Sequence, residues 1–137
     1  MKEVYRSKYA VATYDEQSEL YTLKYLPETA NMMDDEWKEL MLKLLGVTEK
    51  YKPKFILDDN TNRLYAYPPE MQAWTLELFI DSWNKNGLKK YVQILPKEFF
   101  GQLSAEQIVE LANMTFSEIF KNTFVEDYDS AIKWINE

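Results

Sequence analysis

The chain has 137 residues, of which 46% are hydrophobic and 28% charged, and it contains neither histidine nor cysteine. A chain of this length suits one folded domain with one core, and we expect residues 1–137 to form a single domain. Without imidazole or thiol groups, Ser-His and Cys-His catalysis and the usual zinc, haem and iron–sulfur ligand sets are excluded. We therefore expect a protein that is not an enzyme and that carries no cofactor.

Acidic residues outnumber basic ones by 23 to 16, so the formal net charge is -7 at pH 7. This charge is repelled by phosphate groups, which makes nucleic acids and anionic membrane surfaces poor partners. Residues 1–6 carry charges where a signal peptide needs an apolar stretch, and no run approaches the roughly 20 apolar residues of a membrane span. We predict a cytoplasmic location.

The first half of the chain contains two alternating segments, one helical pattern and one short apolar run. Residues 9–14 and 20–25 alternate with period two and predict an antiparallel hairpin. Apolar residues at helical spacing follow the acidic turn 34–36 and predict a helix that ends before Pro53, with a weak point at Gly46. Residues 55–57 are apolar on both faces, which is typical of a buried central strand.

In the second half, Pro68 and Pro69 can begin a helix that ends near Asn86 and Gly87. The pattern then predicts a strand at 91–95, a helix through 108–119 behind the capping box of Ser104 and Gln107, a strand at 123–125, and a terminal helix that begins at Asp127 or Asp129.

The predicted order is β-β-α-β-α-β-α-β-α. It indicates an α/β protein with a mixed, mostly parallel central sheet, an N-terminal β-hairpin and about four helices. In such sheets the functional surface usually lies at the carboxyl ends of the parallel strands. Here that edge would carry Asp58, Asp59, Asn60, Pro96, Glu126 and Asp127.

The segment 58–62, Asp-Asp-Asn-Thr-Asn, is the most chemically suggestive cluster, because oxygen ligands at alternate positions can hold a hard cation. The calcium-loop pattern fails, since Arg63 stands where glycine is needed and Pro69 where glutamate is needed. The simpler interpretation is a turn in which Asp58 and Asn60 accept backbone amides, and we expect no metal. Asp58 and Asp59 should point to opposite faces of the strand and so cannot share a proton.

The second helix carries more apolar residues than one buried face requires. Met71, Trp74 and Leu78 form one stripe, and a second stripe consists of Leu76, Phe79, Ile80 and Trp83. Either the helix is buried on two sides, or it exposes an apolar patch that serves as a partner surface, a dimer interface or the wall of a ligand pocket. Tyr65 and Tyr67 precede the helix and could extend that surface.

Four segments together resemble an STAS-like domain, a relative of the anti-anti-sigma factors of bacterial sporulation: residues 55–58, the helix introduced by Pro68-Pro69-Glu70 with Gln72 and Trp74, the strand 91–96, and the ending 128–135. The resemblance implies a non-enzymatic bacterial regulator that binds another protein and carries a phosphorylatable serine or threonine where the helix after the central strand begins. This sequence departs from that pattern, because the nearest hydroxyl, Thr61, lies several residues too early. STAS-like domains also resemble lipid-binding folds of the CRAL-TRIO type, which implies an apolar pocket.

We predict that the chain binds another protein, or a second copy of itself as a homodimer. The expected binding surface consists of Asp58, Asp59, Asn60, Thr61, Tyr65, Tyr67, Met71, Trp74, Leu78 and Trp83. The alternative is a small apolar ligand or lipid in a pocket beside the second helix. A carboxylate-dependent metal enzyme that uses Asp58 and Asp59 is the third hypothesis.

Overall fold

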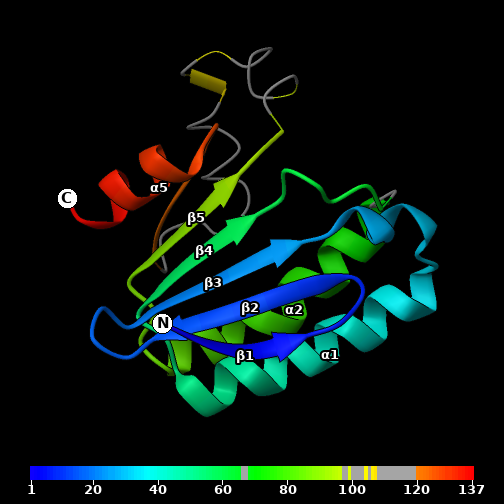
Figure 1. The fold of residues 1–137 in the computed structure, drawn as a ribbon, viewed down its shortest axis with the longest axis horizontal. Helices are drawn as coiled ribbons and strands as arrows, with labels where there is room; N and C mark the ends of the chain where they lie inside the picture. Colours follow the sequence, from blue (N-terminus) through cyan, green and yellow to red (C-terminus); the bar gives the residue numbers. More distant parts are fainter. Residues whose placement is uncertain (66–67, 97–98, 100–103, 105, 108–119) are drawn as a thin grey trace.

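The computed structural model describes residues 1–65, 68–96, 99, 104, 106–107 and 120–137. They form one six-stranded sheet in which the strands lie side by side in sequence order (Figure 1). The first three strands pair antiparallel and the last four pair parallel, so the mixed, mostly parallel sheet of an α/β protein is confirmed. The strands are β1 (Lys2–Arg6), β2 (Ala10–Asp15), β3 (Leu20–Tyr25), β4 (Phe55–Asp59), β5 (Lys90–Ile94) and β6 (Lys121–Val125).

The edge strand β1 was not expected from the sequence, so the predicted N-terminal hairpin is part of a three-stranded antiparallel unit. β1 buries little of its surface, and its pairing with β2 is interrupted between Glu3 and Tyr5. An exposed edge strand with a register shift lacks regular apolar alternation, which is the signal used to recognise a strand.

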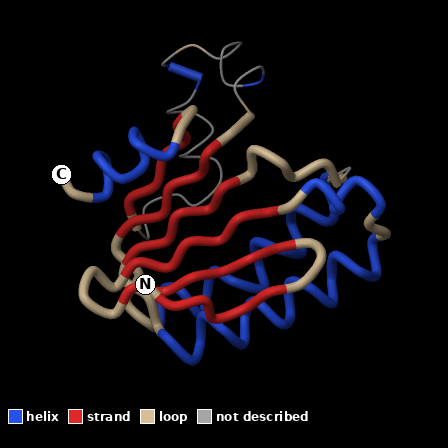
Figure 2. Tube along the Cα trace, viewed as in Figure 1, coloured by secondary structure: helices blue, strands red, loops and turns tan. Residues whose placement is uncertain are grey.

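Two long helices, α1 (Asp34–Tyr51) and α2 (Pro69–Lys85), lie against one face of the sheet, and α5 (Tyr128–Ile135) packs on the other (Figures 1 and 2). Among the described residues these are the three α-helices, and a short 3-10 helix at Pro27–Asn31 lies between β3 and α1. The predicted helix through 108–119 lies outside the described residues. Its capping box is confirmed, since Ser104 Oγ accepts from Gln107 N at 3.1 Å and Gln107 Oε1 accepts from Ser104 N at 2.9 Å.

Helix α1 begins at the predicted acidic turn, where Glu36 Oε1 accepts from Met33 N at 2.9 Å. It continues through Gly46, which was expected to be a weak point, because that position faces solvent and a single glycine costs a helix only about 1 kcal/mol. It ends where predicted, as Lys52 adopts a left-handed conformation with φ of 49° just before Pro53.

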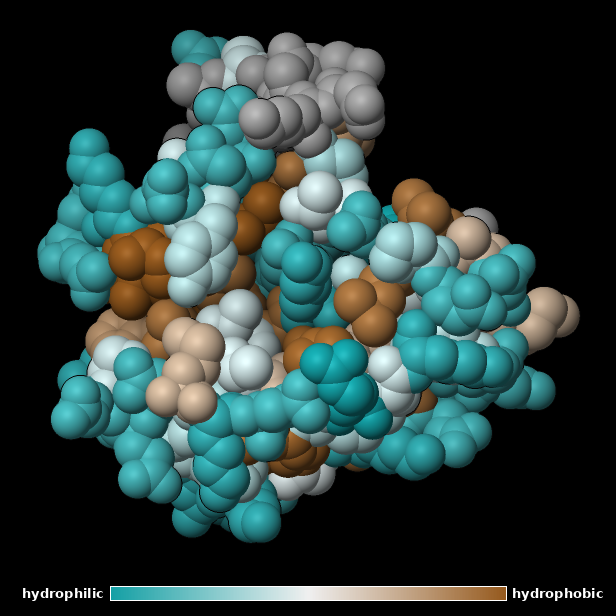
Figure 3. All heavy atoms as spheres, in the orientation of Figure 1, coloured by the Kyte–Doolittle hydropathy of each residue, from teal (hydrophilic) through white to brown (hydrophobic). Residues whose placement is uncertain are grey.

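The alternating side chains of the sheet supply two separate cores. The core under α1 and α2 contains Ala12, Leu23, Ile56 and Trp37, whereas Leu57 and Val92 pack with Ala131 and Ile135 of α5 on the opposite face. Figure 3 shows hydrophobic residues beside α5 and over the neighbouring strands, bordered by hydrophilic ones.

Helix α5 is fixed at both ends. Asp127 Oδ1 accepts from Ser130 N at 2.8 Å at its start, which confirms Asp127 as the cap. The Lys90 ammonium group donates to the backbone oxygens of Trp134, Ile135 and Glu137 at 3.0, 3.2 and 3.0 Å. None of the helices in the described ranges combines the length and apolar character that crossing a bilayer requires.

Candidate ligand-binding site

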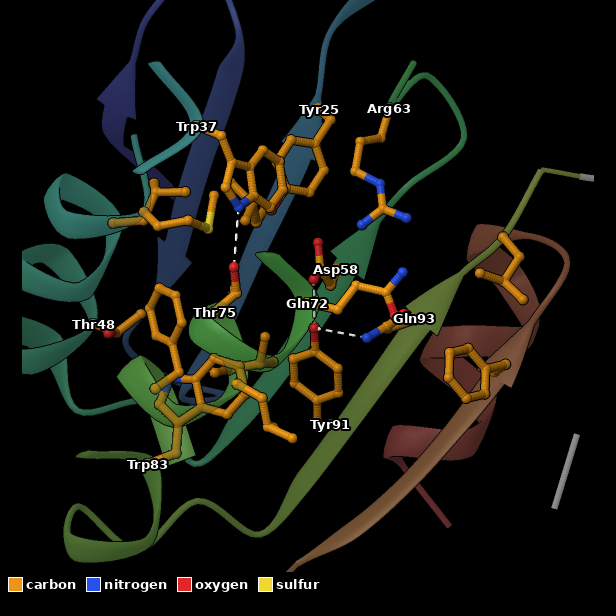
Figure 4. Close-up of a pocket in the computed structure, with 18 of the residues that line it drawn as sticks. Tyr25, Trp37, Thr48, Asp58, Arg63, Gln72, Thr75, Trp83, Tyr91 and Gln93 are labelled. Carbon is orange, nitrogen blue, oxygen red and sulfur yellow. Dashed lines mark hydrogen bonds between the residues drawn. The ribbon is translucent and has the colours of Figure 1, made fainter. Parts of the chain in front are cut away.

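A cavity of about 530 Å³ lies between the sheet and the helices α1 and α2 (Figure 4). Strands β3, β4 and β5 form its floor, and α2 forms one wall. Much of the lining is aromatic and comes from Tyr25, Trp37, Phe79, Trp83 and Tyr91. Such a lining, with few polar groups, is typical of small-molecule sites.

The strand register places one carboxyl group in this apolar floor. Asp58 of β4 lies directly beside Leu23 of β3 and Gln93 of β5. Because side chains alternate along a strand, all three point to the face that α1 and α2 cover. Asp58 is consequently buried, with 9% of its surface exposed.

Two strands hold the Asp58 carboxylate in a short hydrogen-bond chain (Figure 4). The Tyr91 hydroxyl donates to Asp58 Oδ2, and Gln93 Nε2 donates to the Tyr91 oxygen at 3.1 Å. The other oxygen, Asp58 Oδ1, is buried and receives no hydrogen bond from any described residue. The Arg63 guanidinium group is directed toward the carboxylate from the loop after β4 (Figure 4).

Burial raises the pKa of Asp58 from 3.8 to about 6, because the charged carboxylate loses its contact with water. The hydrogen bond from Tyr91 and the positive charge of Arg63 act in the opposite direction, while the charge of Asp59 adds to the rise. Burial and the nearby Asp58 charge raise the pKa of Tyr91 well above its ordinary value. Asp58 therefore changes its charge close to neutral pH, while Tyr91 stays protonated and remains a donor.

Stacked aromatic rings join α1 to the sheet at one side of the cavity. Trp37 lies between Tyr25, with ring centroids 5.7 Å apart, and Tyr65, with centroids 4.9 Å apart. The Trp37 indole nitrogen donates to Thr75 Oγ1 at 3.0 Å, and the Tyr65 hydroxyl donates to Asp34. The indole of Trp37 thus links α1 to α2.

A second aromatic group closes the opposite side. Trp83 of α2 packs against Phe79 and Tyr91, with ring centroids 5.1 and 4.9 Å away, and against the edge of Phe120 at 6.1 Å. Trp83 is buried, with 8% of its surface exposed, so it supports the cavity from within the core.

The polar segment after β4 differs in part from its prediction. Asp58 and Asp59 point to opposite faces, as expected: Asp58 lines the cavity, and Asp59 is half-buried and does not line it. The turn acceptor is Asp59, whose Oδ1 accepts from Thr61 N at 3.0 Å, and not Asp58. Asn60 is buried and donates from Nδ2 to the Asp58 backbone oxygen at 3.2 Å, where the sequence suggested an acceptor. Thr61 is exposed.

The remaining predicted residues do not form one outer surface. Tyr65, Met71 and Trp83 are buried in the core, whereas Trp74 and Leu78 are half-buried. The Trp74 ring carries the Lys38 ammonium group 5.6 Å from its centroid. Tyr67 lies outside the described residues. Of the predicted surface, Asp58 and Trp83 line the cavity.

Sequence reasoning missed Arg63, Gln72, Tyr91 and Gln93, the polar residues that surround Asp58 in the cavity (Figure 4). Tyr91 and Gln93 alternate with the apolar Val92 and Ile94 in β5, and that alternation places Tyr91 and Gln93 on one face. This alternation identifies Tyr91 and Gln93 as neighbours of Asp58 only when β5 is known to lie beside β4.

The chemistry of the site follows from the buried carboxyl group of Asp58. Among the described residues, no three acidic side chains come together as metal ligands would. The carboxyl group can accept a hydrogen bond at Oδ1 or hold a proton near pH 6. In comparisons with protein families, curated proteins and solved structures, nothing matched this chain.

Proposed function

We propose that this protein binds a small, largely apolar molecule in the cavity beside α2. The observation that carries the proposal is the cavity itself, whose volume of about 530 Å³ falls within the range of small-molecule sites. Its aromatic walls provide apolar contact area, and the polar groups around Asp58 provide a point at which a ligand can be oriented.

The burial of α2 favours this function over binding to another protein. Protein interfaces depend on a few large anchors that are exposed before binding. Of the three aromatic residues of α2, Phe79 and Trp83 face the core, and Trp74 is half-buried. Association with another protein, or with a second copy of the chain, stays a prediction that sedimentation velocity of the purified protein would test.

The likeness to STAS-like domains also stays a prediction, and so does a regulatory, non-enzymatic role in the bacterial cytoplasm. Helix α2 begins at Pro69, and Pro68 occupies its N-cap. A proline carries no hydroxyl group to phosphorylate, so the phosphorylatable residue of the STAS pattern has no counterpart at the start of α2.

Blocking the cavity tests the proposed function. Ala73 lies on α2 and lines the cavity, so Ala73→Trp would fill part of it. Glu77→Trp is the matched control, because Glu77 is exposed on the same helix and does not line the cavity. In native mass spectrometry of gently purified protein, the wild type and Glu77→Trp should retain a bound small molecule that Ala73→Trp lacks.

Circular dichroism should show the same helix content in all three proteins, which separates loss of the ligand from loss of the fold. Two results would contradict the proposal. One is repeated recovery of ligand-free wild-type protein that also fails to bind any apolar compound added to it, and the other is equal binding by Ala73→Trp.

A further inference from the structure

We propose that the ligand is a flat aromatic molecule whose inner end is a hydrogen-bond donor, such as an amidine, amine or amide N–H, bound to Oδ1 of Asp58. This inference rests on the proposed function, since it specifies what the cavity binds. It names the chemistry at the buried end of the ligand and the shape of the part that fills the remaining space.

The donor requirement follows from the two oxygens of Asp58. Oδ2 already accepts from the Tyr91 hydroxyl, and Tyr91 is held in place by Gln93. Asp58 lines the cavity, and its Oδ1 is buried without a donor from the described residues. A buried carboxylate oxygen accepts strongly and cannot donate when ionised, so the ligand must supply the hydrogen.

The charges around the site disfavour the opposite ligand, an anion. A carboxylate placed next to Oδ1 would bring a second negative charge against Asp58 in a poorly hydrated space. The positive charge of Arg63 already acts on Asp58, because it lowers the pKa of that carboxyl. The whole chain also has a net charge of -7, which adds to the repulsion of anions.

The aromatic walls specify the shape of the ligand body. Trp37 and Tyr25 are stacked with their planes 20° apart on one side of the cavity. Trp83 and Tyr91 lie on the other side, with their planes 32° apart. Because these stacks already cover some of the ring faces, a flat ligand ring would pack against the edges and uncovered faces that line the cavity, and aromatic pairs gain more than their buried area alone provides.

Four probes of nearly equal size test the inference: benzamidine, benzamide, benzoate and toluene. Each probe has one benzene ring, and the probes differ in the group attached to it. The group donates hydrogen bonds in benzamidine and benzamide, accepts them as an anion in benzoate, and does neither in toluene. Binding is followed near pH 7.5 by NMR titration, with the indole N–H signals of Trp37 and Trp83 as reporters of the cavity. We expect benzamidine and benzamide to bind at least about tenfold more tightly than toluene and benzoate. Benzamidine would donate a charge-assisted hydrogen bond to Asp58, and benzamide would donate a neutral one.

The variant Asp58→Asn sharpens the test. An asparagine oxygen can still accept from Tyr91, and its amide nitrogen would then offer a donor to the cavity. We expect benzamidine to lose about tenfold in affinity and benzoate to gain, so that the order of the two probes is reversed. Asp59→Asn is the matched control, because it removes the neighbouring charge outside the cavity and should leave the order unchanged.

The outcomes separate the two proposals. Toluene that binds as tightly as benzamidine would overturn the donor inference and leave the apolar cavity as a ligand site. Benzoate as the tightest probe would also overturn it. If none of the four probes shifts the indole signals, the cavity is not a ligand site and the proposed function fails as well. If Asp58→Asn does not fold, the order of the probes on the unaltered protein still decides.

Discussion

Tyr91 and Asp58 are bonded diagonally across two neighbouring parallel strands: the register pairs Asp58 with Gln93, and the Tyr91 hydroxyl reaches the carboxylate from two residues earlier in β5. The hydrogen bond from this hydroxyl thus stabilises the ionised form of a carboxyl group that burial would otherwise keep protonated to still higher pH. This pair connects two strands of the sheet and lines the cavity.

The variant Asp58→Asn should stabilise the protein at neutral pH. The folded pKa of Asp58, about 6, lies above its ordinary value of 3.8, so the folded state binds the proton more tightly. Stability from this group is therefore present at low pH and is lost as the pH rises through about 6. A shift of this size corresponds to about 2–3 kcal/mol.

Urea unfolding of Asp58→Asn and of the wild type should show that difference near pH 8 and almost none near pH 4. Asp59→Asn controls for the simple removal of a negative charge. A gap between Asp58→Asn and the wild type that does not change with pH would show that the carboxyl group titrates normally.

Removing the Tyr91 hydroxyl should have the opposite effect. Tyr91→Phe leaves Oδ2 of Asp58 without its donor and should cost about 1–3 kcal/mol of unfolding free energy at neutral pH. Because the Tyr91 bond lowers the pKa of Asp58, its loss should raise that pKa above about 6, which carboxyl carbon NMR titration measures.

Tyr21→Phe is the control for this variant. The Tyr21 hydroxyl is equally buried in the cavity lining, yet it makes no hydrogen bond to a described residue. Its removal should be neutral or slightly stabilising. If both variants lose the same stability, the effect comes from removing a buried hydroxyl group and not from the bond to Asp58.

The link between α1 and α2 should depend on the Thr75 hydroxyl. Thr75→Val keeps the shape of the side chain but removes the acceptor for the Trp37 indole, and it should cost about 1–2 kcal/mol. Thr75→Ser retains the hydroxyl and should stay close to the wild type. Hydrogen exchange at the Trp37 indole N–H reports the bond directly, and unchanged exchange in Thr75→Val would contradict its role.

The two tryptophans of α2 should respond differently to truncation. Trp83→Ala removes a buried side chain that touches three other rings and should cost about 3–5 kcal/mol in chemical unfolding. Trp74→Ala removes a half-buried ring and should cost about 1 kcal/mol. Equal costs would mean that the buried side of α2 contributes no more to stability than its outer side. Loss of self-association in Trp74→Ala would instead support an interface at the outer side.

The elements with strong periodicity were predictable from the sequence, and their limits followed from local chemistry. The acidic turn before Trp37, the proline start of α2 and the Asp127 cap each act on the residues next to them. Strand β1 was not predictable, because the pairing that makes it a strand comes from β2 and leaves little trace in its own composition.

The candidate site was only partly predictable for a related reason. Alternation along β4 correctly separated Asp58 from Asp59, but it could not name the partner of Asp58. That partner is determined by which strand lies beside β4 and by the register between them, and both are set by packing across the whole sheet. The same limit explains why the sequence left open whether Trp83 is buried or forms part of a binding surface; the structure shows that it is buried.

The carboxyl group in the cavity floor has one consequence for calorimetry. A ligand that binds only the ionised form of Asp58 must expel the proton that occupies about half of the molecules near pH 6. The buffer takes up that proton, so the heat of binding near pH 6 should vary with the ionisation enthalpy of the buffer. Two buffers of contrasting enthalpy would therefore count the protons released for each ligand bound.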